Sequence, residues 1–199
     1  MNPSRQLRIA LVILAAAVAA FVFADFHLAK SNTNTSFNRS SAHTSAPDGY
    51  QPGNTLLYIA AGDANVLSKA LAQAVFDQAG TSGYFSPILL ANAPQADQFP
   101  AVLVSASGEE FFWTPVYSRS NLKINLVFSN FRAVESIDSS PEVITLPAQN
   151  GSPAIEGSGQ AEQVDQSYGL LSLPGYRNLI TRSAAKSVVE NLIEIVKLH

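Results

Sequence analysis

The residues best placed to do chemistry are two adjacent acids, Glu109 and Glu110, followed directly by the aromatic run Phe111–Trp113. A pair of carboxylates is the minimum for glycoside hydrolysis, and acids beside aromatic rings occur where sugars bind. Adjacent residues of a strand point to opposite faces, so these two acids cannot flank one bond by themselves. A third acid would be needed, from Asp97, Glu135 or Asp138. A solvated turn that leads into a core-facing strand explains the same pattern without any chemistry.

The same stretch predicts a candidate binding surface made of Trp113, Tyr117 and Arg119. Trp113 and Tyr117 would share one face of a strand, because positions an even number apart project to the same side. If helices leave that face uncovered, its aromatic side chains would mark a surface for a partner or a ligand. The turn charge of Arg119 would add polar contacts.

Several kinds of site are excluded or disfavoured by residue type. The chain contains no cysteine, so it forms no disulfide and offers no thiolate nucleophile or cysteine metal ligand. Its histidines lie at the edge of the apolar segment (His27), in the spacer (His43) and at the last residue (His199), so we expect none inside the folded domain. A Ser-His-Asp arrangement needs an imidazole held by the fold, and zinc sites usually need His or Cys. We therefore predict no catalytic residues, no cofactor and no metal.

The N-terminal part of the chain consists of a short basic stretch and an apolar segment. Arg5 and Arg8 precede an uncharged run, IALVILAAAVAAFVFA, over residues 9–24. The positive-inside rule places residues 1–8 in the cytoplasm and the C-terminal part outside it. Residues 9–29 are predicted to form a single-pass signal-anchor helix in the cell membrane. The alternative is a signal peptide cleaved after Ala24, which would release a secreted chain.

The rest of the chain divides into a spacer and one domain. Residues 30–54 are rich in Ser, Thr, Asn, Pro and Gly and lack apolar periodicity, so we expect a flexible polar linker. Residues 55–199 have the length of one ordinary domain. An apolar run at 56–61 predicts a buried strand, and the helical periodicity that follows it ends at Gly80.

The second half of this domain has the pattern of strands followed by a helix. Residues 101–107, 111–118 and 122–131 are expected to form an antiparallel meander, with Leu122, Ile124, Leu126 and Phe128 on one face. An amphipathic stripe predicts a final helix over 176–198. The order predicts an α+β fold, a two-layer sandwich of a mostly antiparallel sheet with two helices packed on one face.

Charge and residue types then restrict the function. Twelve Lys and Arg against fifteen Asp and Glu leave a net charge of −3, without a basic cluster that would attract nucleic acid. We expect an extracytoplasmic domain, tethered to the membrane by its N-terminal helix, that is not an enzyme. It would bind a protein partner or scaffold an envelope complex. The alternatives are a secreted or anchored binding module for a glycan, lipid or other small ligand, and a hydrolase that uses carboxylates.

Overall fold

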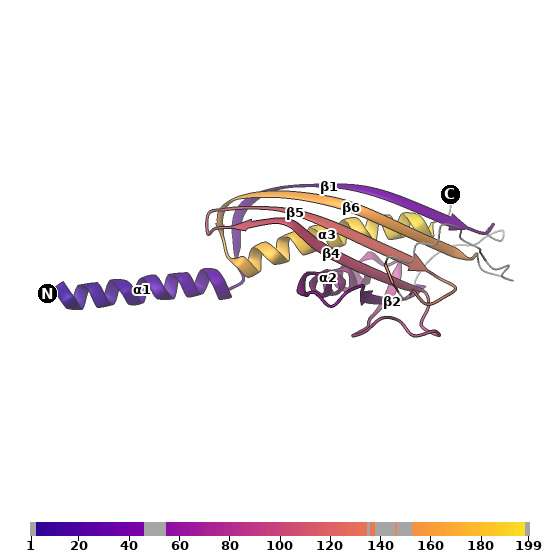
Figure 1. Ribbon diagram of the computed structural model, residues 1–199, viewed down its shortest axis with the longest axis horizontal. Coiled ribbons are helices and arrows are strands. Elements are labelled where there is room, and N and C mark those ends of the chain that lie inside the picture. The colour runs from indigo at the N-terminus through magenta and orange to yellow at the C-terminus, as the bar shows by residue number, and fades with distance from the viewer. Residues whose placement is uncertain (1–2, 46–54, 135, 138–145, 147–152, 198–199) are drawn as a thin grey trace.

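The computed structural model describes residues 3–45, 55–134, 136–137, 146 and 153–197 (Figure 1). In this part of the chain the fold is α+β, with a six-stranded mixed sheet and three helices. The elements in chain order are α1 (Pro3–Phe23), β1 (His27–His43), β2 (Thr55–Ala61), α2 (Val66–Ser82), β3 (Phe85–Leu89), β4 (Ala101–Trp113), β5 (Tyr117–Ser129), β6 (Ile155–Leu171) and α3 (Leu173–Val196).

The sheet has the strand order β1-β6-β5-β4-β2-β3. The four long strands β1, β6, β5 and β4 pair antiparallel with one another, whereas β2 is parallel to both β4 and β3. The strand and helix expected from residue 56 onward are present as β2 and α2, and β3 follows them. They extend the antiparallel part of the sheet rather than forming a separate unit.

The predicted meander is wrong in its turns. Residues 101–129 form one long hairpin, β4 and β5, with a single turn at residues 114–116. Thr114 closes this turn, because its N–H and hydroxyl both donate to the carbonyl of Tyr117 and its hydroxyl accepts from the Tyr117 N–H. Pro115 therefore lies in the turn, where it needs no ladder hydrogen bond, and not in a strand. The turn expected near Ser107 is instead a bulge between Gly108 and Glu110.

The flexible linker expected over residues 30–54 is wrong for residues 30–43, which belong to β1. This strand is antiparallel to β6 along its whole length, from His27 beside Leu171 to His43 beside Ile155. Its side chains are mostly polar on both faces, so it lacks the apolar alternation by which strands are recognised. Pairing with β6 supplies its stability. Residues 27–29 are also strand rather than anchor helix, and residues 46–54 lie outside the described part of the chain.

Both helices of the domain begin at a side-chain cap, and the predicted end of the first one at Gly80 is wrong, because α2 continues to Ser82. The Asn65 side chain accepts from the Ser68 N–H at 2.7 Å, and Gly83 ends α2 with a φ of 74°, a conformation that glycine adopts without strain. Ser172 caps α3 in the same way, accepting from the Gly175 N–H at 3.0 Å. The final helix therefore begins at Leu173, three residues before the predicted start.

The main hydrophobic core lies between the two helices and one face of the sheet, which we call the inner face. The four apolar side chains predicted to share one face of β5, at positions 122, 124, 126 and 128, are all buried on it. Leu71 and Val75 of α2 and Val188 and Leu192 of α3 join the cluster that includes the last three. In Figure 1 both helices lie beneath the sheet. The opposite, outer face is covered near Leu103 and Val127 by Val134.

Two glycines in β6 let neighbouring elements approach the inner face closely. A Cβ on Gly157 would lie 2.9 Å from Cγ2 of Ile195 in α3, and one on Gly159 would meet the ring of Phe37 in β1. Real Cβ atoms do not make such contacts without displacing the neighbour. The Gly-Ser-Gly sequence at 157–159 is therefore explained by packing.

Helix α1 projects from the end of the domain at which β1 begins (Figure 1). Its residues Gln6–Phe23 have a mean hydropathy of 2.3, and none of this window is buried inside the molecule. It is long and apolar enough to cross a membrane, by length and composition. Only residues 24–26 separate it from β1.

Candidate functional site

The three residues of the predicted binding surface do not share one face. Trp113 is paired with Ser118 in the β4–β5 ladder, and Phe112 is paired with Arg119. Residues directly opposite each other project to the same side, so Tyr117 and Arg119 lie on the outer face and Trp113 lies on the inner one. The prediction failed because the turn at 114–116 separates Trp113 from Tyr117, which removes the simple alternation of a single strand.

Trp113 packs against a small core cluster at the start of α3. This cluster consists of Leu122, Leu171, Tyr176 and Ile180, all buried. The indole Nε1 is buried and has no hydrogen-bond partner among the described residues. Trp113 is therefore a half-buried core residue.

On the outer face, three aromatic rings from neighbouring strands form a row. The rings of Phe112 and Tyr117 are 6.0 Å apart between centroids, and those of Tyr117 and Tyr168 are 5.0 Å apart. Both contacts have tilted geometry, which is favourable for aromatic pairs. Phe112 and Tyr168 are more than half exposed. This row contains Tyr117 from the predicted surface, but Phe112 and Tyr168 were not expected there.

Glu109 and Glu110, the two acids considered for carboxylate chemistry, form ion pairs with residues of β5. Glu110 lies 3.0 Å from Arg119, and Glu109 pairs with Lys123. The bulge before Glu110 lets these adjacent acids contact cations of the same strand. The hydrogen bond and charge of Glu109 raise the pKa of Lys123. Of the possible third acids, Glu135 and Asp138 lie outside the described residues, and no described contact joins Asp97 to this pair.

A buried polar network lies on the inner face, and sequence reasoning missed it. Asp165 of β6 is fully buried and accepts from Thr33 Oγ1 at 2.6 Å and from Ser167 Oγ at 2.9 Å. Ser167 Oγ lies 2.7 Å from Ser31 Oγ, which lies 3.1 Å from Nε2 of His27. Hydrogen bonds of this kind are what allow a carboxylate to be buried. His27 is therefore held by the fold, contrary to the sequence prediction.

Tyr176 of α3 lies beside this network. Its hydroxyl donates to Ser120 Oγ at 3.0 Å, and its side chain is fully buried. Burial raises the pKa of Tyr176 well above its ordinary value of 10.0, and the charge of Asp165 acts in the same direction, while the bond to Ser120 opposes them. The network therefore holds a neutral phenol, and its hydroxyls connect β1, β6, β5 and α3.

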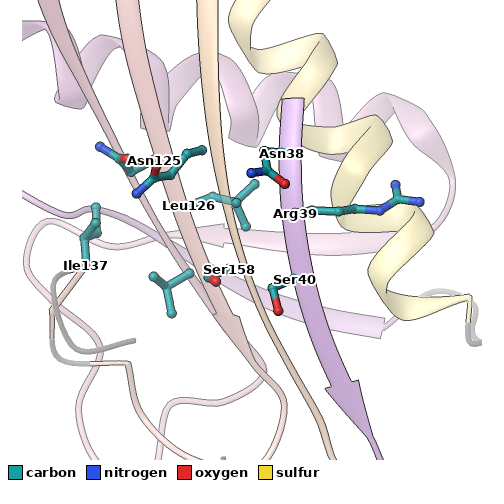
Figure 2. A pocket seen from close by; sticks show the side chains of 10 residues that line it. Asn38, Arg39, Ser40, Asn125, Leu126, Ile137 and Ser158 are labelled. Atoms are coloured by element: carbon teal, nitrogen blue, oxygen red, sulfur yellow. The ribbon is translucent and has the colours of Figure 1, made fainter. Parts of the chain in front are cut away.

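The outer face of β1, β6 and β5 carries a shallow polar groove of about 310 Å³ away from the aromatic row (Figure 2). Asn38, Gln160 and Asn125 stand side by side across these three strands. Arg39 points away toward α3, where it contacts Asn191 and Glu194 (Figure 2). None of the described residues that line the groove is an acid or a histidine, so they offer hydrogen bonds but no acid–base chemistry.

A second cavity of about 300 Å³, mostly apolar, opens between α2, α3 and β4. Val66, Leu67, Phe111 and Leu122 supply its apolar lining, and Arg177 lies 6.0 Å from the centre of the Phe111 ring. The combination of an apolar wall and one cation suits a small amphiphilic ligand. Among the residues that the structure describes, no group of three or more His, Asp or Glu side chains could hold a metal ion.

The other notable feature is the open edge of β1. The strand pairs with β6 on one side and is the first strand in the sheet, so its other side has no neighbour within the described chain. Seventeen residues at about 3.3 Å each give an edge about 55 Å long. It contains no proline, and its register with β6 is unbroken. Proline and β-bulges are two of the devices that proteins use to protect such edges, and β1 has neither.

The hydrogen bonds that flank β1 show which of its backbone groups face this edge. Ser172 N–H donates to the Phe26 carbonyl, and Thr44 N–H donates to the Ala154 carbonyl, both at 3.0 Å. In an antiparallel ladder alternate residues bond to the same neighbour. The even-numbered residues of β1 therefore bond to β6, and the odd-numbered ones, from 27 to 43, direct N–H and C=O groups to the open edge.

Comparisons with known proteins show no family for this chain. No family model matches it, and no curated protein matches it. Among solved structures, the PelC dodecamer from Paraburkholderia phytofirmans in space group P6 matches with a TM-score of 0.30 and 13% identity, over 81% of this chain and 99% of that one. A variant of the same dodecamer in space group C2 matches with a TM-score of 0.29, at the same identity and coverage. TM-scores this low do not establish a common fold and support no argument about function.

Proposed function

We propose that this chain is a membrane-tethered extracytoplasmic domain, a two-layer sandwich without catalytic activity, that binds a protein partner or scaffolds an envelope complex. The observation that carries the proposal is the open edge of β1 beside an exposed apolar helix. The edge offers a protein partner a row of backbone hydrogen-bonding groups, and the helix restricts the partners to those at a membrane.

The tether is supported by α1 and by the residues that precede its apolar part. The helix is apolar and exposed over Gln6–Phe23, so burial in lipid would remove it from water. Arg5 and Arg8 favour a cytoplasmic N-terminus, which places β1 and all that follows on the other side. Cleavage after Ala24 is the alternative, and it would yield a secreted chain that begins at Asp25.

An extended segment of another protein is the occupant that we propose for the β1 edge. Adding a strand to an exposed edge satisfies backbone groups on both partners, and the pockets for alternate side chains give specificity. A second copy of this chain, paired antiparallel along β1, would have its α1 at the opposite end of the assembly (Figure 1). One flat membrane does not accommodate both helices in that arrangement. We therefore assign the edge to a different protein.

Two substitutions of Ser41 provide a matched test of this assignment. Ser41→Pro removes an N–H group that faces the open edge, and Ser41→Ala leaves it in place. We expect a partner to be cross-linked and co-purified from detergent-solubilised native membranes with the wild-type full-length chain and with Ser41→Ala, but not with Ser41→Pro at unchanged melting temperature. Equal recovery with Ser41→Pro would reject the edge as the interaction site. Release of the chain from membranes by alkaline carbonate would reject the tether.

A binding module for a lipid or another small amphiphile is the second candidate, because of the apolar cavity beside Phe111 and Arg177. Ala70 also lines this cavity, so Ala70→Leu should reduce its volume. We expect a fluorescent fatty acid to bind the full-length chain in detergent and to bind Ala70→Leu more weakly. Equal binding by the two proteins would reject the cavity as a ligand site.

A further inference from the structure

Exposed apolar side chains gather at the end of the domain from which α1 emerges. They come from the start of β1, the end of β6 and the β4–β5 hairpin, whose bent ends stand beside the C-terminal end of α1 (Figure 1). We call this group the apolar end patch. It consists of Leu28, Phe112, Val116, Tyr117, Tyr168 and Leu170.

The register of the sheet joins these residues into one surface. Leu28 is paired with Leu170, and Tyr168 stands between Lys30 and Tyr117. Val116 lies in the hairpin turn, and its carbonyl accepts from the Gly169 N–H at 3.0 Å. Leu28 is 75% exposed, Tyr168 60% and Val116 59%. These apolar side chains are therefore left in contact with solvent.

The outer face changes character along the strands. Next to α1 it carries leucine, valine and aromatic side chains, and farther along β1 it carries only amides and hydroxyls, on Asn32, Asn34, Ser36, Asn38 and Ser40. A surface that binds a soluble partner can have its apolar side chains at any distance from the membrane anchor. A surface that meets the membrane must have them next to the anchor.

We propose that the apolar end patch lies in the interfacial layer of the same bilayer that α1 crosses, so that the domain rests on the membrane. This inference rests on the proposed tether. The occupant is a lipid surface, and the argument for it is the continuity of the patch with the membrane-spanning helix.

The connection between α1 and the domain is short and fixed by hydrogen bonds, so it keeps the patch close to the membrane. Residues 24–26 span at most about 10 Å when extended. The Phe26 N–H donates to Ser172 Oγ at 2.9 Å, and the side-chain amide of Asn178 donates to Asp25 at 2.7 Å. The rings of Phe21 and Phe26 also meet, 5.2 Å apart, across the end of the helix. The position of the domain therefore follows that of α1.

The length of α1 determines the depth of this connection. The apolar window Gln6–Phe23 has 18 residues and is about 27 Å long at 1.5 Å per residue. The hydrocarbon core of a bilayer is about 30 Å thick. A helix slightly shorter than the core is accommodated when the bilayer thins or flanking residues enter the interface. The end of α1 therefore lies at or below the headgroups, and the patch lies at their level.

The chemistry of the patch suits this layer rather than an electrostatic contact. Tyrosine concentrates at membrane interfaces because its ring is apolar and its hydroxyl is polar. Lys30 beside Tyr168 can place its ammonium group among the headgroups while its stem packs on the ring. Arg119 is paired with Glu110, so the patch adds little net charge. Its contact with lipid is therefore driven by apolar burial and needs no anionic lipid.

The absence of cysteine makes a direct test possible with single labels on the full-length chain. Ala15→Cys, Val116→Cys and Ser41→Cys are each labelled with an environment-sensitive fluorophore in detergent and reconstituted into phosphatidylcholine vesicles that carry nitroxide near the headgroups or deep in the acyl chains. Ala15 lies inside α1, Val116 in the patch, and Ser41 at the far end of β1. Leu28→Cys is a second patch position, in case the turn does not tolerate the label.

We expect the label at Ala15 to be quenched by the deep nitroxide, the labels at Val116 and Leu28 by the shallow one, and the label at Ser41 by neither. Quenching at Ala15 without quenching at Val116 and Leu28 would overturn the resting position while leaving the tether intact. An unquenched label at Ala15 would overturn the tether, and this inference with it. Quenching at Ser41 equal to that at Val116 would show a domain lying flat and would also overturn the proposed contact.

Discussion

Ser172 and Phe26 bind each other through three hydrogen bonds. The Phe26 N–H donates to Ser172 Oγ at 2.9 Å, and the Phe26 carbonyl accepts from both the N–H and the hydroxyl of Ser172 at 3.0 Å. The same Ser172 oxygen caps α3. The residue at which the N-terminal helix joins the domain is therefore fastened to the start of the last helix, and the two ends of the fold are stabilised together.

Gly175 should be the most sensitive position of this joint. A Cβ at residue 175 would meet the Phe26 carbonyl oxygen, a backbone atom that cannot move independently. We expect Gly175→Ala to lower the free energy of unfolding by more than about 2 kcal/mol. Gly80→Ala is the matched control, because Gly80 also lies in a helix and its Cβ would have 3.6 Å to the nearest atom. It should stabilise by about 0.5–1 kcal/mol, and urea unfolding in detergent would measure both.

Thr33 and Thr35 test whether β1 is part of the domain. Thr33 Oγ1 donates to the buried Asp165 at 2.6 Å, whereas Thr35 Oγ1 makes only a long bond of 3.4 Å to Gln163. We expect Thr33→Val to cost about 1.5–3 kcal/mol, because a bond to a charged group is lost, and Thr35→Val to cost less than about 1 kcal/mol. If neither change affects the urea midpoint, β1 behaves as a linker and the described strand is wrong.

Tyr176 should make the domain sensitive to alkali. Because its pKa is raised above the ordinary value of 10.0, the folded chain retains the phenol proton after the unfolded chain has lost it. Its contribution is complete below about pH 10 and is lost as pH rises above that value. We expect the urea midpoint to fall as the pH rises above about 10, and Tyr176→Phe to reduce that fall. Tyr168→Phe, a change at an exposed ring, should leave the fall as in wild type.

Proline should destabilise the domain much more at Ser40 than at Ser41. Ser40→Pro removes an N–H that bonds to β6 and should cost about 2–3 kcal/mol. Ser41→Pro removes one that faces the open edge, and extended backbone precedes it, so the cost should be below about 1 kcal/mol. Melting temperatures of the two full-length variants give the comparison. Equal losses would mean that the assignment of inward and outward groups in β1 is incorrect.

Local patterns accounted for the elements that bury an apolar stripe. The helix that begins at Val66, the buried face of β5 and the final helix all follow from apolar spacing. The end of α2 was predicted at Gly80, three residues before the glycine that caps it, Gly83. The apolar character of α1 was equally plain. These features depend on residues close together in the chain, so the sequence alone determined them.

Only the tertiary structure decided the position of β1 and of everything attached to it. Its side chains are mostly polar on both faces, and its strand conformation depends on β6, more than one hundred residues away in the chain. The only local sign was the alternation of Thr33, Thr35 and Phe37 with asparagine and serine. The burial of Asp165 and the hydrogen bond of His27 to Ser31 follow from that pairing. The hairpin turn at Pro115 likewise depended on the register of β4 with β5, and it placed Trp113 and Tyr117 on opposite faces. Long-range pairing, which no local pattern records, thus determined both the candidate surface and the rigid joint to α1.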